Sequence, residues 1–362
     1  MNTNITSTTT IVNLVDQLDI IRQYIAIWFG LFLVIFGNIG NLLLITLFFS
    51  DTLLRVNPCS RYILSSSICD LVQLNSTLVI GILADGFNHD LTIRFSLCCK
   101  LRNYFDQLSS TTTLTFILLA TIERYLLTSS KHHSCRLKHL LTKTRPISLV
   151  TVAIWSLISI PNLIEHSKTR QCQLTRSVTH AFIGLICLSF LPILLMFIFG
   201  VLTLNNLRKL GKHAQIMRAE QIYKRLLHID KQLTILLLIQ ISIISLATLP
   251  FMTSYTYIII FRHRFRSSSW RAWESLILLI IRFIHYLHNC IDFYIYMLVS
   301  SMFRHHFIKL MKRYYWYWSK GCCGRGNRRK RSLMRRHSNE EITKKCIFKQ
   351  PISQKHSVLI IY

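Results

Sequence analysis

Two charged residues in one apolar stretch of the chain, Asp106 and Arg124, have the spacing of groups on one helix face. Five turns at ~3.6 residues per turn cover that spacing, so a helix would align the two groups about 27 Å apart. The aspartate can hold a cation, and the arginine can pair with an acidic side chain. Glu123 and Tyr125 flank Arg124. We interpret the stretch as a helix with a charged group near each end, although two unrelated polar positions would give the same spacing.

Two further carboxylates, Asp70 and Asp292, also fall inside apolar stretches. In a low-dielectric interior two carboxylates cannot both ionise cheaply unless a cation lies between them. We expect them to lie close together, joined by Thr113 and Asn289. The pair then holds either a sodium ion or a shared proton in a hydrogen-bonded polar core.

The sequence shows no enzyme constellation. We find no metal-ligand spacing, no nucleophile elbow and no glycine loop that would bind phosphate. We therefore expect a protein without catalytic activity, and no cofactor apart from the possible sodium ion.

These polar groups need elements that carry them through an apolar environment. Of the 362 residues 51% are hydrophobic and 16% charged, with a mean hydropathy of +0.37, which is unusual for a soluble domain. The apolar residues form blocks close to or above the ~20 residues that a helix needs to cross a bilayer. Seven spans are predicted, at about 24–49, 62–83, 99–125, 147–164, 178–204, 233–261 and 273–299. The fold class is therefore an all-α integral membrane protein, a seven-transmembrane helix bundle.

Orientation follows from the positive charge, because cytoplasmic loops retain lysine and arginine. Segments that would share one side of the membrane hold 31 of the 43 lysines and arginines. We expect a multi-pass protein of the plasma membrane with its N-terminus outside and its C-terminus inside. The net charge of +28 then reflects contact with anionic lipids of the bilayer rather than with nucleic acid.

The chain resembles rhodopsin-like (class A) G-protein-coupled receptors, and within them invertebrate neuropeptide-type receptors. Motif residues occur in the family's order on all seven spans, and together they are far more specific than any one of them. They are Gly40-Asn41, Asp70, Cys99, Glu123-Arg124-Tyr125, Trp155, Pro192, Pro250 and the altered motif Asp292-Phe293-Tyr294-Ile295-Tyr296.

The resemblance implies an outer disulfide and an inner latch. The disulfide would join Cys99 to Cys172, although Cys98 could compete by proximity. In the latch, Arg124 would pair with the neighbouring Glu123 and with Asp230 in the inactive state and be released for a heterotrimeric G protein. Tyr125 and Tyr296 complete this coupling group by resemblance, and the resemblance also favours sodium between Asp70 and Asp292.

The ligand site is expected around Asp106. By resemblance Asp106 would anchor a ligand cation and Tyr286 would hold its carboxylate, while Phe251 and Phe283 would add aromatic walls. Arg282 lies one turn outward of Tyr286 and suits a ligand with both charges, which favours an extracellular peptide over a small cationic monoamine. An internal salt bridge between Asp106 and Arg282 is the alternative account of these two charges.

Three departures from the family bear on signalling. Thr248 stands where the family has tryptophan, Gly200 where it has tyrosine, and Phe293 where it has proline. A receptor-like decoy or scaffold that binds without signalling is therefore an open alternative. A small transporter is disfavoured because the spans lack paired Gly/Pro interruptions.

The remaining predictions concern the two ends of the chain. Residues 1–23 are expected to be an extracellular segment glycosylated at Asn4, 24–300 the receptor domain, and 301–362 a basic cytoplasmic tail. The tail should begin with a short amphipathic eighth helix, followed by Cys322 and Cys323 as candidate palmitoylation sites. Serines after its basic runs imply kinases, and by resemblance arrestin, as partners.

Overall fold

The computed structural model describes residues 2–50, 58–87, 89–129, 133–164, 186, 189–216, 221–261 and 267–322, with side chains outside the description at 2–12, 58, 93, 133–143, 210–216, 221–230 and 317–322. The chain divides into two units, Met1–Phe307 and Ile308–Tyr362. Within the described ranges every regular element is a helix. The elements are α1 (Asn2–Ser50), α3 (Pro58–Gln73), η1 (Leu74–Leu78), α4 (Val79–Phe87), α5 (Leu91–Arg94), α6 (Ser96–Ser129), α7 (His133–Ser159), α8 (Pro161–Ile164), α10 (Leu191–Ile216), α11 (Gln221–Ile260), α12 (Ser268–Val299) and α13 (Ser301–Cys322).

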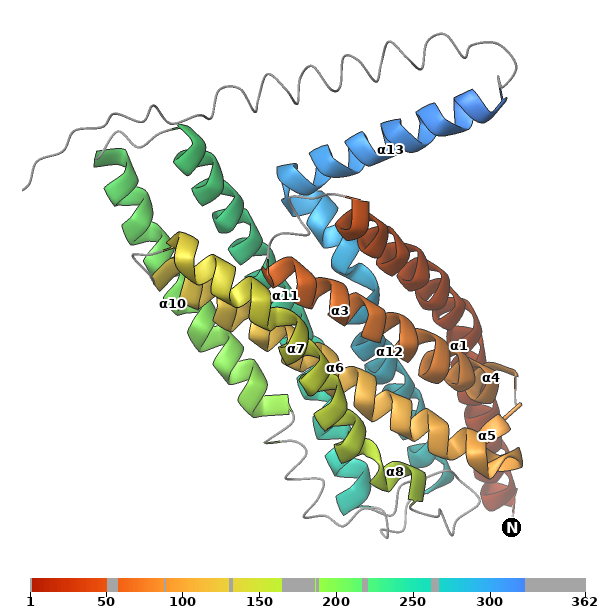
Figure 1. Ribbon diagram of the computed structural model, residues 1–362. Coiled ribbons are helices and arrows are strands. Elements are labelled where there is room, and N and C mark those ends of the chain that lie inside the picture. The colour runs from red at the N-terminus through yellow and green to blue at the C-terminus, as the bar shows by residue number, and fades with distance from the viewer. Residues whose placement is uncertain are drawn as a thin grey trace, which may run out of the picture. The chain divides into compact units, whose positions relative to one another are not determined.

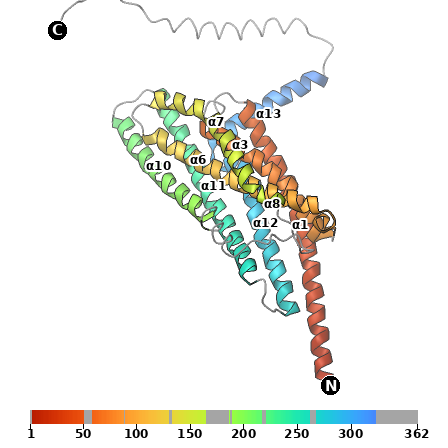
Figure 2. The same cartoon turned by 60° about the horizontal axis from the view of Figure 1, so that its bottom comes forward.

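The helices that form the bundle pack side by side within the first unit. In Figures 1 and 2, α6 runs among its neighbours, and it contacts α3, α7, α10 and α11. On the other side of the bundle α12 packs against α1 and α11. The seven-transmembrane bundle expected from the apolar blocks is confirmed.

Six helices of the described chain are long and apolar enough to cross a membrane. α6 is long enough but too polar to be among them, because it carries Asp106, Gln107 and a run of serine and threonine. Some of those hydroxyls bond to carbonyls of their own helix, as Ser109 does to Phe105 and Thr111 to Gln107. A central helix tolerates this polarity because its neighbours, rather than lipid, surround it.

Several helices are longer than the apolar blocks predict. α1 starts at Asn2 rather than near residue 24, and α11 starts at Gln221 rather than near 233. Hydropathy marks only the part of a helix that meets hydrocarbon, whereas the backbone hydrogen bonds continue into polar sequence. At the outer end of α1, Leu18 packs with Ala272 and Leu276 of α12.

The second span is divided by a π-helical turn. η1 lies between α3 and α4, and Asn75 and Ser76 there donate to the carbonyls of Leu71 and Val72. A π-turn changes the rotation of the helix beyond it and often occurs at functional sites. It sets the direction of α4, which carries Asp85.

A helix, α13, follows α12 and is separated from it by one residue; that it is the amphipathic eighth helix stays a prediction. Ser300 has extended backbone angles, and its hydroxyl accepts from the amide of Phe303. α13 runs to Cys322 and is therefore longer than the short helix that the sequence predicts. Its placement along a membrane surface stays a prediction.

Candidate functional site

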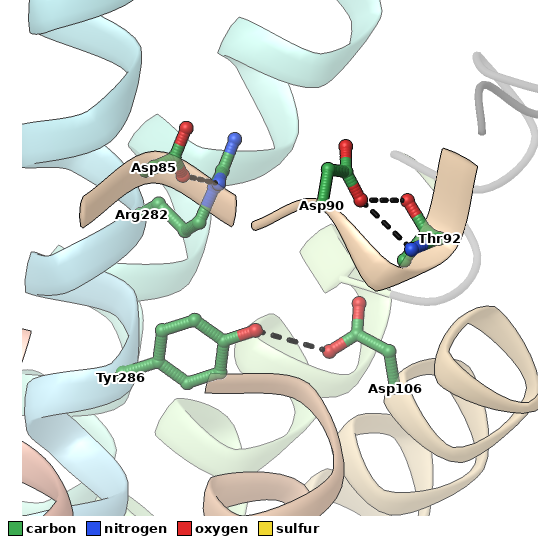
Figure 3. A network of polar contacts seen from close by, with 6 residues as sticks. All are labelled: Asp85, Asp90, Thr92, Asp106, Arg282 and Tyr286. Atoms are coloured by element: carbon green, nitrogen blue, oxygen red, sulfur yellow. Dashed lines mark hydrogen bonds and ion pairs between the residues drawn. The ribbon is translucent and has the colours of Figure 1, made fainter. Parts of the chain in front are cut away.

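The outer part of the site is built around Asp106 of α6. One carboxylate oxygen accepts from the hydroxyl of Tyr286 on α12 and from Nε2 of Gln73 on α3, each at 3.4 Å. Figure 3 shows the tyrosine hydroxyl directed at the carboxylate. Asp106 is half-buried, whereas Tyr286 is 3% exposed. Both contacts are long for hydrogen bonds, so Asp106 can exchange them for a shorter bond to a cation.

Arg282 does not pair with Asp106. Its Nη1 lies 2.9 Å from Oδ2 of Asp85, so α12 is tied to α4 by an ion pair that both Figure 3 and the distance show. The alternative in which Arg282 neutralises Asp106 is therefore not the arrangement in this structure. Arg102, one turn outward of Asp106 on α6, is half-buried. Carboxylates and guanidinium groups thus alternate across this outer region.

The two aromatic residues expected beside Asp106 lie apart from each other. Phe251 of α11 stacks on His285 with ring centroids 4.3 Å apart. Phe283 is 3% exposed and packs edge-on to Phe29 of α1, with centroids 5.7 Å apart. It belongs to an apolar cluster of α1, η1, α4 and α12. The structure therefore places Phe251 beside the ring that precedes Tyr286, and Phe283 in the core toward α1.

The predicted interior group is buried, but its hydrogen bonds differ from the expected ones. Thr113 donates to Asp70 at 3.0 Å, as expected. Asn289 instead donates to Oε1 of Gln73 at 3.0 Å, and its backbone carbonyl accepts from Asn41 at 2.8 Å. These contacts join α1, α3, α6 and α12 through side chains.

The same interior group has oxygen atoms that could bind a cation. Asn289 Oδ1 is buried and has no hydrogen-bond partner within the described residues. Asp70 and Asp292 are 1% and 6% exposed. Oxygen donors of this kind suit a hard cation and buried carboxylates require a counter-charge or a proton. No group of three or more His, Cys, Asp or Glu side chains that could hold a metal occurs in the described chain.

At the inner end, Arg124 is buried at 1% exposed and Glu123 at 5%. Glu123 Oε1 accepts from the hydroxyl of Thr144 on α7 at 3.2 Å. The ring of Tyr125 packs with Phe199 of α10 at 5.4 Å. The backbone of Asp230 lies in α11, but its side chain is outside the described ones. The pairing of Arg124 with Asp230 therefore stays a prediction.

A hydrogen-bonded bridge that the sequence did not suggest joins α11 to α12. Gln240 of α11 donates to Oδ2 of Asp292 at 2.6 Å and accepts from the hydroxyl of Tyr296 at 2.8 Å. Two turns toward the inner end of α11, Gln232 accepts from Ser300 at 3.0 Å and donates to Ser301 at 2.9 Å. We call Gln232 and Gln240 the glutamine bridge. The amide side chain of Gln240 within an apolar stretch was the sequence signal that could have indicated this bridge.

Other contacts that the sequence did not predict also support the site. Asp85 holds Arg282, and Thr144 holds Glu123. Trp155 of α7 donates to Thr115 of α6 at 2.9 Å. Partners of this type cannot be read from spacing within one helix, because each contact joins two helices.

Cys99 is disulfide-bonded, whereas Cys98 is a free thiol. Cys172 and Cys323 lie outside the described residues, and the side chains of Asn4 and Cys322 are also not described. The pairing with Cys172 and the two modifications stay predictions.

Comparison with protein families identifies the family of the chain. The sequence matches the family described as 7 transmembrane receptor (rhodopsin family) over residues 40–296, more than two thirds of the chain. A comparison with curated proteins gives no significant match. The matched region runs from α1 to the inner end of α12 and includes Asp106, Arg124 and Tyr296. The chain belongs to the rhodopsin family of seven-transmembrane receptors.

Proposed function

We propose that this receptor binds an extracellular peptide in the outer half of its bundle and activates a heterotrimeric G protein at its inner end. The proposed ligand class is of neuropeptide type, as in the invertebrate receptors that the sequence resembles. The receptor acts in the plasma membrane with its N-terminus outside. Kinases and arrestin act on its cytoplasmic tail.

The ligand proposal rests on the contacts of the Asp106 carboxylate. Its carboxylate is half-buried and is held by two contacts of 3.4 Å from neutral donors, while the nearby Arg282 is engaged by Asp85 at 2.9 Å. Asp106 is therefore not bonded to Arg282 and can accept a hydrogen bond from a ligand cation. Arginines above it disfavour a ligand that is only cationic, which supports a peptide over a monoamine.

The coupling proposal rests on the inner ends of α6 and α11. Release of Arg124 and separation of α11 from α12 would open a cleft for the G protein, a change between two discrete arrangements. A sodium ion among Asp70, Asp292, Thr113 and Asn289 would hold the resting arrangement. Asn289 Oδ1, which no described residue satisfies, supports this proposal.

A binding protein that does not signal is the second candidate. Gly200 lies against α11 so closely that an added Cβ would be 2.5 Å from Cδ2 of Leu238. Thr248 Oγ1 is buried without a hydrogen-bond partner in the described chain. Gly200 thus allows close packing against α11, and neither Gly200 nor Thr248 supplies the aromatic side chain that the family has there, which is the observation that favours this candidate.

Guanine-nucleotide exchange in membranes from cells expressing the receptor distinguishes the two. A signalling receptor raises exchange above that of cells lacking it, and Arg124→Ala at matched surface expression abolishes the increase. A screen of peptides and amines on the same membranes then identifies the ligand class. Saturable peptide binding without any exchange would instead establish the decoy.

A further inference from the structure

A pocket of about 590 Å³ is lined by residues of α1, α3 and α7 near the inner side of the bundle. Phe48 and Phe49 of α1 form part of its apolar wall. Its other lining side chains include two arginines, Arg61 of α3 and Arg145 of α7. The pocket therefore combines an apolar wall with concentrated positive charge.

Hydroxyl groups line the same pocket. Ser65 donates to the carbonyl of Arg61 at 3.0 Å, and Ser148 donates to that of Thr144 at 2.9 Å, so the oxygens of both remain available as acceptors. Ser60 is different: it is 1% exposed, and its Oγ is buried with no hydrogen-bond partner in the described part of the chain. A buried hydroxyl without a partner costs about 1–3 kcal/mol, so its retention at a pocket wall points to a ligand atom.

The backbone adds to the positive potential. α3 begins at Pro58, so Ser60 and Arg61 lie in its first turn. Amide groups of a first turn carry partial positive charge and bind anions such as phosphate. Among the side chains that the structure describes, Glu123 opposes this potential, because it accepts a hydrogen bond from Thr144 of the pocket lining.

We propose that this pocket binds the phosphorylated headgroup of an anionic phospholipid from the cytoplasmic leaflet. Arg61 and Arg145 contact phosphate oxygens, Ser60 donates its hydroxyl to one of them, and an acyl chain follows Phe49, which is 55% exposed. The planar guanidinium group of arginine can donate two parallel hydrogen bonds to phosphate oxygens. Basic pockets between transmembrane helices suit such headgroups. The choice of the cytoplasmic leaflet depends on the proposed orientation of the receptor, whereas the contacts with the headgroup do not.

Native mass spectrometry of the purified full chain in detergent, titrated with phosphatidylinositol 4-phosphate, tests the proposal. Wild type should bind one molecule at least tenfold more tightly than phosphatidylcholine. Arg145→Gln, an exposed site where the change leaves the fold intact, should weaken binding by roughly tenfold because one charge-assisted contact is lost. Ser60→Ala should weaken it by about two- to fivefold while leaving thermal stability unchanged or higher.

Arg208→Gln is the matched control, since Arg208 is an exposed inner residue of α10 outside the pocket. It should change the affinity less than twofold. Equal losses from Arg208→Gln and Arg145→Gln would show only diffuse attraction to the basic surface and would overturn the proposal. Equal affinity for phosphatidylcholine would also overturn it. Binding of soluble glycerophosphoinositol 4-phosphate as tight as that of the lipid would mean a free-phosphate site instead. None of these outcomes depends on signalling.

Discussion

Asp106 owes its proposed role to what surrounds it as much as to its charge. Gln73 and Tyr286 contact it as neutral donors, and Arg282 forms its ion pair with Asp85 instead. If Arg282 contacted Asp106 directly, a ligand cation would have to displace an internal guanidinium. As the residues lie, a ligand cation replaces or shortens the two 3.4 Å contacts, while the half-buried Arg102 lies one turn outward.

Asp106→Asn should lower the affinity of a peptide agonist by about 30-fold to several-thousand-fold, which corresponds to about 2–5 kcal/mol. Asparagine keeps the shape and can still accept from Tyr286, so thermal stability should change little. Concentration–response curves at matched surface expression measure the effect. Asp90→Asn is the control, because Asp90 caps α5 by accepting from the amide of Thr92 at 2.8 Å, and asparagine caps equally well. Unchanged agonist potency in Asp106→Asn would end the cation-anchor proposal.

The adjacent cysteines allow a second prediction at this scale. Cys99 is bonded and Cys98 is free, so Cys99→Ser should reduce surface expression or ligand binding strongly, and Cys98→Ser should not. Cys172→Ser should reproduce the Cys99→Ser loss, because both remove one bridge. Flow cytometry of the tagged receptor measures all three. A mild Cys172→Ser phenotype beside a severe Cys99→Ser one would assign Cys99 another partner.

Between elements, the glutamine bridge links α11 to α12 and to Ser300 and Ser301, which follow α12. Its two residues are eight apart, just over two turns, so they lie on the same side of α11, about 80° apart around its axis. Four hydrogen bonds of 2.6–3.0 Å involve them. Any change that moves the inner half of α11 away from α12 must break these bonds. The bridge therefore favours the arrangement seen here.

Gln240→Leu should raise ligand-independent nucleotide exchange several-fold and lower the melting temperature of the receptor. Asp292 and Tyr296 would each lose a buried partner, at about 1–3 kcal/mol per group, and a bias of that size shifts a two-state equilibrium by roughly 5- to 150-fold. Ser245→Ala serves as the control, because that hydroxyl bonds to Ile241 within its own helix. Lower stability with unchanged basal exchange would make the bridge structural only.

The element scale also shows how far sequence reasoning reaches. Periodicity along one helix located Asp106 and Arg124, and apolar blocks located the spans, because both signals are local. Gln240 was missed because its importance depends on Asp292 and Tyr296, more than fifty residues away. Phe283 was assigned to the ligand site because sequence does not tell which neighbour a side chain of α12 faces. The structure shows that Phe283 faces α1, where it packs on Phe29.

For the whole molecule, the distribution of charge explains how the bundle sits in a bilayer. Helices α1, α7 and α10 expose large apolar side chains along their length, among them Trp28, Leu149, Leu157 and Val201. Such exposure is costly in water and suits contact with lipid. The positive charge gathers toward the end of the bundle that holds Arg124, where anionic lipids attract it.

This asymmetry predicts the topology. An epitope placed before Met1 should be stained on intact cells, whereas one placed after Tyr362 should be stained only after permeabilisation, because translocating the basic inner segments is disfavoured. Replacing exposed inner cations, Arg208 and Lys209, with glutamine should leave that pattern unchanged, since two of 31 charges carry little of the bias. Staining of the C-terminal epitope on intact cells would reverse the orientation. It would also move the phospholipid pocket to the outer leaflet and Asp106 to the cytoplasmic side, so this measurement constrains both proposed sites.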